Sequence, residues 1–405
     1  MKNNKLYIVM VGLPARGKST ISIRLKETFR NNSIPTMIFN NGNLRREYRP
    51  ARETYHAGFY DPENKPAVEL RKKFALINIE RAKKYLRSKG QIAILDATNA
   101  SRERRELIEE HLNDHPILFI ECINNNKEIL DLSIIQKTKM PEFSHLDRDS
   151  AIKNFRERIS YYETIYTPIK DERNFIRLDS LSNKLLEERL TDPIPYSSRI
   201  RDFLVTDVVK NLFLIRHTET YFNVEDRIGG DPKLTQKGRS QAMALARFFK
   251  NKKISFIFTS QTKRTIQTAR PIKELQQACT IIPLKEFNEI DGGICDSMTY
   301  QEIREKMPEV YLARKKDKYN YIYPQGEGYV TMRERVGKGI KKAFYLNRNS
   351  DNIMIIGHRG LNRMILAHFL YRRDEDVPYI YIPQDKFYHI ISTQDKKVFQ
   401  LKKYE

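Results

Sequence analysis

The segment VGLPARGKST, residues 11–20, has the residue types and the spacing of a phosphate-binding loop. It satisfies the pattern GxxxxGK[ST], in which glycines let backbone N–H groups converge on a polyphosphate, the lysine meets its terminal oxygens and the serine hydroxyl reaches Mg²⁺. An apolar run before the loop and a helical pattern after it give the order of strand, loop and helix that such a site requires. The predicted nucleotide-binding residues are Gly12, Arg16, Gly17, Lys18, Ser19 and Thr20.

A carboxylate ends a second buried-looking run, because IAILDATN places Asp96 after four apolar residues. At the carboxyl edge of a parallel sheet, this carboxylate can face nucleotide-bound Mg²⁺ or the hydroxyl of an acceptor. We therefore predict Ser19 and Asp96 as metal ligands, and helix capping is the alternative role of Asp96. Arginines near these motifs suit a phosphorylated acceptor, although they could equally be solvated charge on a helix. They are Arg45, Arg46, Arg71, Arg102, Arg104 and Arg105.

A second set of residues suited to phosphoryl transfer begins with Arg216 and His217, which follow the apolar run LFLI. A neutral imidazole can attack phosphorus while an adjacent guanidinium holds the phosphoryl oxygens. A single histidine after a strand is most often structural, but three further residues accompany this one. Arg264 begins a helical pattern, Glu289 lies in a glycine-flanked loop, and His358 ends another apolar run. The set supplies a nucleophile, two arginines for phosphate, a second histidine and an acid for the leaving alcohol.

Apolar runs of strand length alternate with segments of helical period in both halves of the chain, which predicts an α/β fold with parallel sheets. Periodicity weakens over residues 191–209, where two prolines interrupt it, so we predict two domains, residues 1–195 and 205–405. The expected strands are 6–11, 36–39, 92–95, 117–122, 212–215, 256–259 and 353–356. The expected helices are 19–29, 67–88, 101–111, 236–250, 263–276, 330–345 and 361–371.

The composition favours anionic partners, because 73 Lys and Arg residues against 51 Asp and Glu give a net charge of +22. A lysine-rich solvated surface explains the charge equally well. The basic residues that can be placed lie beside phosphate motifs, which favours small anionic ligands over a nucleic-acid stripe. Three widely spaced cysteines indicate a reducing compartment, and no apolar run approaches the roughly 18 residues of a membrane span. We expect a cytoplasmic protein.

Five motifs in the first half together resemble the kinase half of the 6-phosphofructo-2-kinase/fructose-2,6-bisphosphatase family: GLPARGKS, FNNGNLRR, LRK, DATN with RERR, and FRERISYYE. The resemblance implies a P-loop kinase domain that uses ATP and Mg²⁺. It implies that Lys18, Ser19 and Lys137 serve ATP and the transferring phosphoryl group, and that Asp96 serves Mg²⁺ or the fructose 2-hydroxyl. The residues that it implies for fructose 6-phosphate are Arg45, Arg71, Thr98, Arg104, Arg158 and Tyr162.

The second half resembles the histidine phosphatase superfamily, with a phosphoglycerate mutase-like fold, through LIRHTE, KRTIQTA and IIGHRG. RIGGD, NEIDGG, MTYQEI and DKYNYIYPQGE resemble its fructose-2,6-bisphosphatase branch. The resemblance implies a phosphohistidine at His217, a proton donor at Glu289, and no cofactor. It implies that the phosphoryl group is stabilised by Arg216, Asn223, Arg264 and His358. The sugar and its 6-phosphate would contact Gly229, Tyr300, Arg314, Lys318, Tyr329 and Arg363.

Four positions depart from what is usual in this family. Ile134 and Asn124 replace an arginine and a cysteine near the nucleotide, and Thr218 replaces the glycine after the first histidine. Arg359 replaces the glutamine after His358, and its extra positive charge is expected to tighten product phosphate and slow turnover.

The sequence thus predicts a bifunctional enzyme that makes and hydrolyses fructose 2,6-bisphosphate. We expect it to bind small molecules and neither nucleic acid nor a membrane, and a homodimer is one possible assembly. One alternative is a kinase and phosphatase acting on nucleic-acid ends, for which Tyr319, Tyr321 and Tyr323 would be stacking residues. Another is a catalytically silent metabolite sensor. Every proposed catalytic side chain is present, which argues against that sensor.

Overall fold

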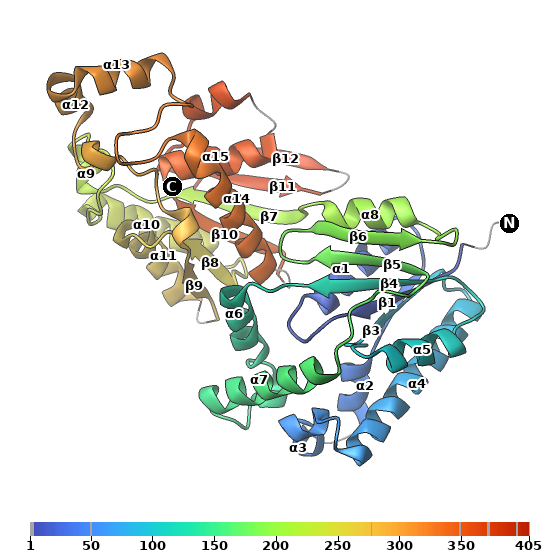
Figure 1. Cartoon of the computed structure of the whole chain (residues 1–405). Coiled ribbons are helices and arrows are strands. Elements are labelled where there is room, and N and C mark those ends of the chain that lie inside the picture. Colours follow the sequence, from blue (N-terminus) through green and yellow to red (C-terminus); the bar gives the residue numbers. More distant parts are fainter. Residues whose placement is uncertain are drawn as a thin grey trace. The chain divides into compact units, whose positions relative to one another are not determined.

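The computed structural model describes residues 4–48, 51–276, 278–347, 350–370, 373–393 and 396–404. The chain divides into two compact units, Met1–Thr206 and Asp207–Glu405. Each unit is built around its own six-stranded sheet, with helices packed against it (Figure 1). Asp207, where the second unit begins, lies two residues after the predicted start of the second domain at residue 205.

The first unit contains a mainly parallel sheet with the strand order β2-β3-β1-β4-β5-β6, in which β6 pairs antiparallel with β5. Every residue of β1 is buried, as expected for a central strand covered by helices on both faces. The strands are β1 (Leu6–Val11), β2 (Thr36–Asn40), β3 (Ile92–Asp96), β4 (Ile117–Ile123), β5 (Asn174–Asp179) and β6 (Lys184–Leu190). The helices are α1 (Lys18–Asn31), α2 (Asn41–Tyr48), α3 (Ala51–Thr54), α4 (Lys65–Arg87), α5 (Arg102–His111), α6 (Lys127–Lys137), α7 (Arg148–Ile165) and α8 (Ser197–Val205).

Two apolar layers hold these helices on the sheet. On one face, Phe29 of α1 and Phe203 of α8 pack with the sheet residues Ile8 and Ile94. On the other face, α4 and α5 contribute a second cluster that includes Ile108. Together, the two layers hold the carboxyl edge of the sheet in place. At this edge, β1 leads into the phosphate-binding loop and β3 ends at Asp96.

The second unit contains a sheet with the order β12-β11-β7-β10-β8-β9, in which β7, β10, β8 and β9 are parallel and β11 pairs antiparallel with β7 and β12. Its strands are β7 (Val209–Arg216), β8 (Phe256–Thr259), β9 (Thr280–Pro283), β10 (Asn352–Gly357), β11 (Lys386–Ser392) and β12 (Lys397–Lys403). Its helices are α9 (Tyr221–Val224), α10 (Gln236–Phe249), α11 (Lys263–Leu275), α12 (Tyr300–Lys306), α13 (Pro308–Lys316), α14 (Tyr329–Leu346) and α15 (Arg359–Leu370). Arg216 lies opposite Gly357 in the register of β7 and β10, so the residues that follow both strands emerge together.

All seven strands expected from the sequence lie within strands of the structure, and the expected helices match α1, α4, α5, α10, α11, α14 and α15. The helix expected over 361–371 ends on a residue that lies outside the described ones. The strands β5, β6, β9, β11 and β12 were not expected from the sequence. Both β6 and β12 are edge strands with charged, largely exposed residues, and β9 has four residues, so none carries a strong apolar run.

Two findings bear on the expected surroundings of the protein. No helix among the described residues is long and apolar enough to cross a membrane. Cys122, Cys279 and Cys295 are buried free thiols. The cytoplasmic location stays a prediction.

Candidate active sites

The phosphate-binding loop leaves β1 through a glycine that no other residue could replace easily. Gly12 has a φ of 131°, and a Cβ atom there would lie 2.5 Å from the Cys122 carbonyl oxygen of β4. Its N–H donates to the Thr98 carbonyl at 3.0 Å, which joins the loop to the segment after β3. Gly17, with a φ of 89°, then leads into α1, whose amino-terminal N–H groups form a ready-made site for anions.

Lys18 lies at the start of α1 with only 8% of its surface exposed. Its Nζ donates to the Leu13 carbonyl at 2.6 Å, so the lysine side chain lies over the loop. Burial, followed by the charges of Arg16 and Lys137, lowers the pKa of Lys18 to about 8, although Cys122 and Asp96 oppose the shift. The lysine is therefore short of a counter-charge that a polyphosphate would provide.

The lowered pKa of Lys18 gives a testable pH dependence. A bound triphosphate favours the ammonium form, so nucleotide binding should take up a proton above pH 8, and affinity should fall by up to about tenfold per pH unit there. Calorimetry in buffers of different ionisation enthalpy measures this uptake. A Lys18→Met variant should lose it, whereas Lys26→Met on the same helix should keep it; equal uptake in both variants would assign the proton to another group.

Asp96 lies across the same sheet edge from the loop. Asn40 donates to its Oδ2 at 2.7 Å, and the two residues are register partners at the ends of β2 and β3. Burial raises the pKa of Asp96, although hydrogen bonds from Ser19 and Asn40 and the charges of Lys18 and Lys137 work in the opposite direction. A divalent cation would stabilise the buried carboxylate in the same way.

The donor set at this edge suits Mg²⁺ bound with a nucleotide. A hydroxyl and a carboxylate are hard oxygen ligands, and phosphates and water complete the coordination of such ions. Among the described residues, no group of three or more His, Cys, Asp and Glu side chains could hold a metal ion by itself. Ser19 and Asp96 therefore fit a shared site better than an all-protein one. Lys137, at the end of α6, faces this site; burial lowers its pKa, and Asp96 partly counteracts the shift.

The predicted sugar-phosphate residues other than Thr98 form a cluster of arginines and tyrosines beside this edge. Arg45 is 4% exposed and donates to the Tyr60 hydroxyl, to Glu142 and, at 3.1 Å, to the Thr54 carbonyl. The Arg158 guanidinium lies 4.0 Å from the Tyr60 ring centroid and 3.9 Å from Glu142. Burial alone would raise the pKa of Glu142, but Arg45, Arg158 and Arg46 hold it below its usual value.

The remaining arginines face Tyr162, whose ring centroid is 5.7 Å from that of Tyr60. Burial lowers the pKa of both Arg71 and Arg104, with the Tyr162 phenol acting in the opposite direction on each. The cluster therefore contains more positive charge than the protein neutralises, as a site for an anion requires. Sequence reasoning missed Asn40, Tyr60 and Glu142, because none of them lies in a pattern that distinguishes it from an ordinary loop or helix residue.

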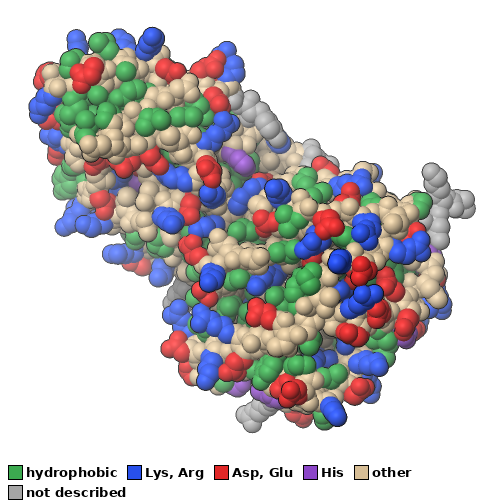
Figure 2. All heavy atoms as spheres, viewed as in Figure 1, with side chains coloured by type: hydrophobic (Ala, Val, Ile, Leu, Met, Phe, Trp, Pro, Cys, Tyr) green, Lys and Arg blue, Asp and Glu red, His purple; other side chains and the backbone are tan. Residues whose placement is uncertain are grey.

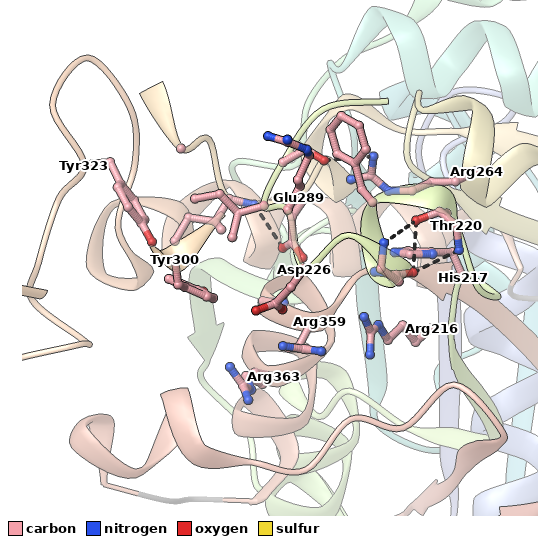
Figure 3. Close-up of a pocket in the computed structure, with 18 of the residues that line it drawn as sticks. Arg216, His217, Thr220, Asp226, Arg264, Glu289, Tyr300, Tyr323, Arg359 and Arg363 are labelled. Carbon is pink, nitrogen blue, oxygen red and sulfur yellow. Dashed lines mark hydrogen bonds between the residues drawn. The ribbon is translucent and has the colours of Figure 1, made fainter. Parts of the chain in front are cut away.

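The second unit contains a cavity of about 230 Å³ at the carboxyl ends of β7 and β10 (Figure 3). All the predicted phosphatase residues line it except His358. The predicted lining residues are Arg216, His217, Asn223, Gly229, Arg264, Glu289, Tyr300, Arg314, Lys318, Tyr329 and Arg363.

His217 presents a neutral imidazole to this cavity. Its backbone N–H donates to the Gly357 carbonyl at 2.9 Å, and its Nδ1 lies 2.8 Å from the Thr218 carbonyl oxygen. Since a carbonyl only accepts, Nδ1 carries the proton and Nε2 keeps its lone pair. Burial, with the charges of Arg264 and Arg216, lowers the pKa of His217 well below its ordinary value. Nε2 is therefore available as a nucleophile at neutral pH.

Two arginines flank this imidazole. Burial and the charge of Arg359 lower the pKa of Arg216 to about 9. Arg264 donates through Nε to His358 Nδ1 at 3.2 Å and through Nη1 to backbone carbonyls of Gly229 and Gly230. Arg216 donates through Nη1 to the Ile382 carbonyl at 3.4 Å. Contacts with protein groups therefore orient both guanidinium groups.

His358 was predicted to stabilise the phosphoryl group, and in the structure it is not among the residues that line the cavity. It is fully buried, and its ring centroid is 5.3 Å from that of His217. Its Nε2 lies 2.8 Å from Ser260 Oγ, while Nδ1 accepts from Arg264. Both ring nitrogens are engaged with protein groups, so His358 orients Arg264 in this structure.

Glu289 reaches the start of α15, where its carboxylate accepts N–H bonds at 3.0 Å from Gly360 and Leu361. The Ile290 N–H adds a third bond, also at 3.0 Å. A Cβ atom on Gly360 would lie 2.7 Å from Glu289 Oε1, so glycine at this position lets the carboxylate seat itself on the helix end.

We expect a Gly360→Ala variant to displace Glu289 and to lower hydrolysis of an alkyl phosphate by roughly tenfold or more, because a misplaced acid cannot protonate the leaving oxygen. The matched control is Gly337→Ala on α14, where a Cβ atom meets nothing within 4 Å. That control should keep full activity and gain up to about 1 kcal/mol of helix stability. Equal rates in the two variants would contradict the close packing of Gly360 on Glu289.

The far end of the cavity is cationic and aromatic. Arg314 donates to the Tyr300 hydroxyl and Arg363 to the Tyr329 hydroxyl, each at 3.0 Å. Figure 3 shows Arg363, Arg359 and Arg216 in a row along one side of the cavity, with Glu289 above them and with Tyr300 and Tyr323 to the left.

Among the other residues that line this cavity, Gln384 and Tyr323 were not predicted for the phosphatase site. Gln384 donates to the Asn223 side chain at 2.8 Å and to the His217 carbonyl at 3.3 Å. Tyr323 lines the far end, below the Arg314 guanidinium. Gln384 follows the last expected element, and no local pattern marks it.

Comparison with known proteins matches a different family model to each half of the chain. The family model for 6-phosphofructo-2-kinase matches residues 1–218, and that for the histidine phosphatase superfamily (branch 1) matches residues 212–404. The 6-phosphofructo-2-kinase/fructose-2,6-bisphosphatase 1 of Rattus norvegicus is 36% identical over 393 residues, which cover 94% of this chain and 80% of the relative. The form 3 protein of Rattus norvegicus is 36% identical over 396 residues, or 95% of this chain and 69% of the relative. The chain belongs to the 6-phosphofructo-2-kinase/fructose-2,6-bisphosphatase family.

Membership in this family confirms the predicted family and the predicted fold, a P-loop kinase domain followed by a histidine phosphatase domain. The two activities that the family carries are those expected from the sequence, and the kinase domain implies the use of ATP. Among solved structures, the alpha-ribazole phosphatase from Shigella flexneri is 24% identical and covers 47% of this chain and 95% of its own, with a TM-score of 0.44.

Proposed function

We propose that the first unit transfers the terminal phosphoryl group of ATP to the 2-hydroxyl of fructose 6-phosphate, and that the second unit hydrolyses the resulting 2-phosphate. The observation that carries the proposal is the neutral His217 imidazole, with Nε2 unprotonated in an arginine-lined cavity, on the same chain as Lys18 in a phosphate-binding loop. One polypeptide would then form and break the same ester.

In the kinase unit, Lys18 and Lys137 would neutralise charge on the transferring phosphoryl group. Ser19 and Asp96 would hold Mg²⁺, which when bound supplies positive charge to the phosphate oxygens. The other predicted role of Asp96 is to accept the proton of the 2-hydroxyl. Arg45 is already paired with Glu142 and Tyr60, so it would orient that wall of the pocket. The sugar phosphate would be held by Arg71, Arg104, Arg158, Tyr162 and Thr98.

In the phosphatase unit, His217 Nε2 would attack the 2-phosphorus while Arg216 and Arg264 hold its oxygens. The bond from phosphorus to the sugar oxygen breaks, and Glu289 gives that oxygen its proton. Water then attacks the phosphorus of the phosphohistidine, and its proton passes to the Glu289 carboxylate. The bond from phosphorus to Nε2 breaks, which restores the neutral imidazole and releases inorganic phosphate. The 6-phosphate would lie among Arg314, Lys318 and Arg363, with Tyr300 and Tyr329 against the sugar.

One preparation tests both halves. Incubation with ATP and fructose 6-phosphate should yield fructose 2,6-bisphosphate. Brief incubation with the 2-³²P-labelled bisphosphate, followed by a denaturing quench, should label the protein through an acid-labile, alkali-stable bond. Failure to synthesise the bisphosphate would overturn the kinase half, and hydrolysis without labelled protein would overturn the phosphohistidine.

Arg359 should retain inorganic phosphate after hydrolysis. It lines the cavity with an exposed side chain, and its charge acts on both Arg216 and His217. We expect Arg359→Gln to weaken product inhibition by phosphate about fivefold, the equivalent of ~1 kcal/mol for one charge-assisted contact. Inhibition constants for phosphate measure this, and Lys315→Gln, which alters an exposed residue outside the cavity lining, serves as the control. Identical constants in wild type and Arg359→Gln would rule the contact out.

We propose small anionic substrates over nucleic acid. Tyr319 and Tyr323 are only 4% and 6% exposed, so the alternating tyrosines do not form the open stacking surface that the alternative needed. On the face shown in Figure 2, Lys and Arg side chains are interspersed with Asp and Glu rather than gathered in a stripe. We also propose a cytoplasmic location. The homodimer stays a prediction.

A further inference from the structure

Arg335 of α14 makes an unusual set of contacts beside the phosphatase cavity, although it does not line the cavity itself. Its guanidinium donates to three backbone carbonyls: those of Glu286 at 2.9 Å, Asn288 at 2.8 Å and Glu289 at 3.1 Å. These carbonyls belong to the short segment that ends in the proposed proton donor. One side chain therefore fixes the main chain of that segment at three points.

The Glu327 carboxylate completes this arrangement. It accepts from Arg335 Nε at 2.8 Å and from Nη2 at 2.6 Å, a bidentate pair that orients the guanidinium plane. Its backbone N–H also donates to the Asp291 carbonyl at 2.9 Å, so Glu327 holds the chain on the other side of Glu289. The segment 286–291 is thus fastened at both ends.

Helix α14 and the segment 286–291 are in close contact, and part of that contact is polar. Lys342 of α14 pairs with Glu286 at 2.8 Å, with both side chains buried. A Cβ atom on Gly339 would lie 2.6 Å from the Phe287 ring, so the helix lies directly against the segment. The Glu289 side chain projects the other way, to the start of α15.

We propose that Arg335 and Glu327 form a positioning pair that sets Glu289 for proton donation to the leaving sugar oxygen. The inference rests on the proposed role of Glu289. Arg335 and Glu327 would act through the main chain and touch neither substrate nor product. Because a shift of about 1 Å in a catalytic group can cost roughly 10²-fold in rate, loosening this segment should slow the acid-dependent step selectively.

A comparison of leaving groups separates positioning from general support of the fold. A sugar alkoxide needs the proton from Glu289, whereas p-nitrophenolate leaves without one. Arg335→Lys keeps the charge but loses the planar fork. It should transfer the 2-phosphate to His217 roughly 10²-fold more slowly in a single turnover, whereas its first-turnover burst of p-nitrophenolate should stay within about threefold of the wild-type rate. The first turnover is the quantity to compare, because the later attack of water on the phosphohistidine uses Glu289 with both substrates. Glu327→Gln should show the same pattern in a milder form, and Arg333→Gln, which alters an exposed residue of α14, should change neither rate.

A double-mutant cycle completes the test. If Arg335 acts through Glu289, then Arg335→Lys combined with Glu289→Gln should be no slower on the 2-phosphate than Glu289→Gln alone. Additive losses, or equal losses with both leaving groups, would overturn the positioning role. A normal rate for Arg335→Lys beside a slow Glu289→Gln would overturn only this inference. A normal rate for Glu289→Gln, or absent hydrolysis in the wild type, would overturn the proposed phosphatase function as well.

Discussion

A His217→Ala variant is expected to lose hydrolysis of the 2-phosphate by roughly 10³-fold or more, while its kinase rate stays within about twofold of wild type. The loss follows because, among the described residues, no other imidazole lines the cavity. The variant should also fail to take up label from the 2-³²P-labelled bisphosphate. Rates in both directions, measured on the same preparation, give the result.

The control for this variant is His389→Gln. His389 lies on β11 of the same unit, where it contacts Asn211 at 2.8 Å and stacks on Phe213. It does not line the cavity, so both activities and the labelling should survive its replacement. Equal loss of hydrolysis in the two histidine variants would point to a damaged fold rather than to a missing nucleophile.

A Lys18→Met variant should show the opposite pattern, with synthesis of the bisphosphate lowered roughly 10²- to 10³-fold and hydrolysis within about twofold of wild type. Methionine keeps most of the buried stem of the lysine and removes the charge that the terminal phosphoryl group would meet. Since burial already disfavours the ammonium group, the folded protein should be no less stable without it. Initial rates with ATP and fructose 6-phosphate measure the loss.

Lys26→Met on α1 is the matched control for Lys18→Met, and it should leave both rates unchanged. The two unlike variants also test whether the sites are separate. A well-folded Lys18→Met protein that lost hydrolysis as well, or a well-folded His217→Ala protein that lost synthesis, would contradict two independent sites.

Much of the fold could be predicted because the central strands are continuous apolar runs. β1 and β10 lie between helix layers, so their residues are apolar on both faces and stand out in the sequence. The strands β6 and β12 could not be found in this way, because an edge strand is exposed and tolerates charge. Their positions depend on pairing with β5 and β11, which a single sequence does not encode locally.

The site residues divide in the same way, into those that a local sequence pattern marks and those that only contacts in the folded chain reveal. Lys18 and His217 belong to compact motifs whose spacing predicts a chemistry. The structure places Lys18 at the start of α1 after the glycine-containing loop and His217 in the cavity of the second unit. Arg335 and Gln384 act on residues distant in sequence through contacts that only the folded chain creates. His358 shows a third case: its motif was recognised, but its burial behind Arg264 could not be anticipated from the residues around it.

The phosphatase cavity is lined by seven Lys and Arg side chains and by two acidic ones, Asp226 and Glu289. Like charges enclosed in so small a volume repel one another, and this repulsion lowers the free energy of unfolding of the domain. A bound phosphate ester raises the free energy of unfolding again, because a ligand that binds only the folded state shifts the folding equilibrium toward that state. The survival of this domain against proteolysis in a living cell would therefore rise and fall with the concentration of sugar phosphates around it.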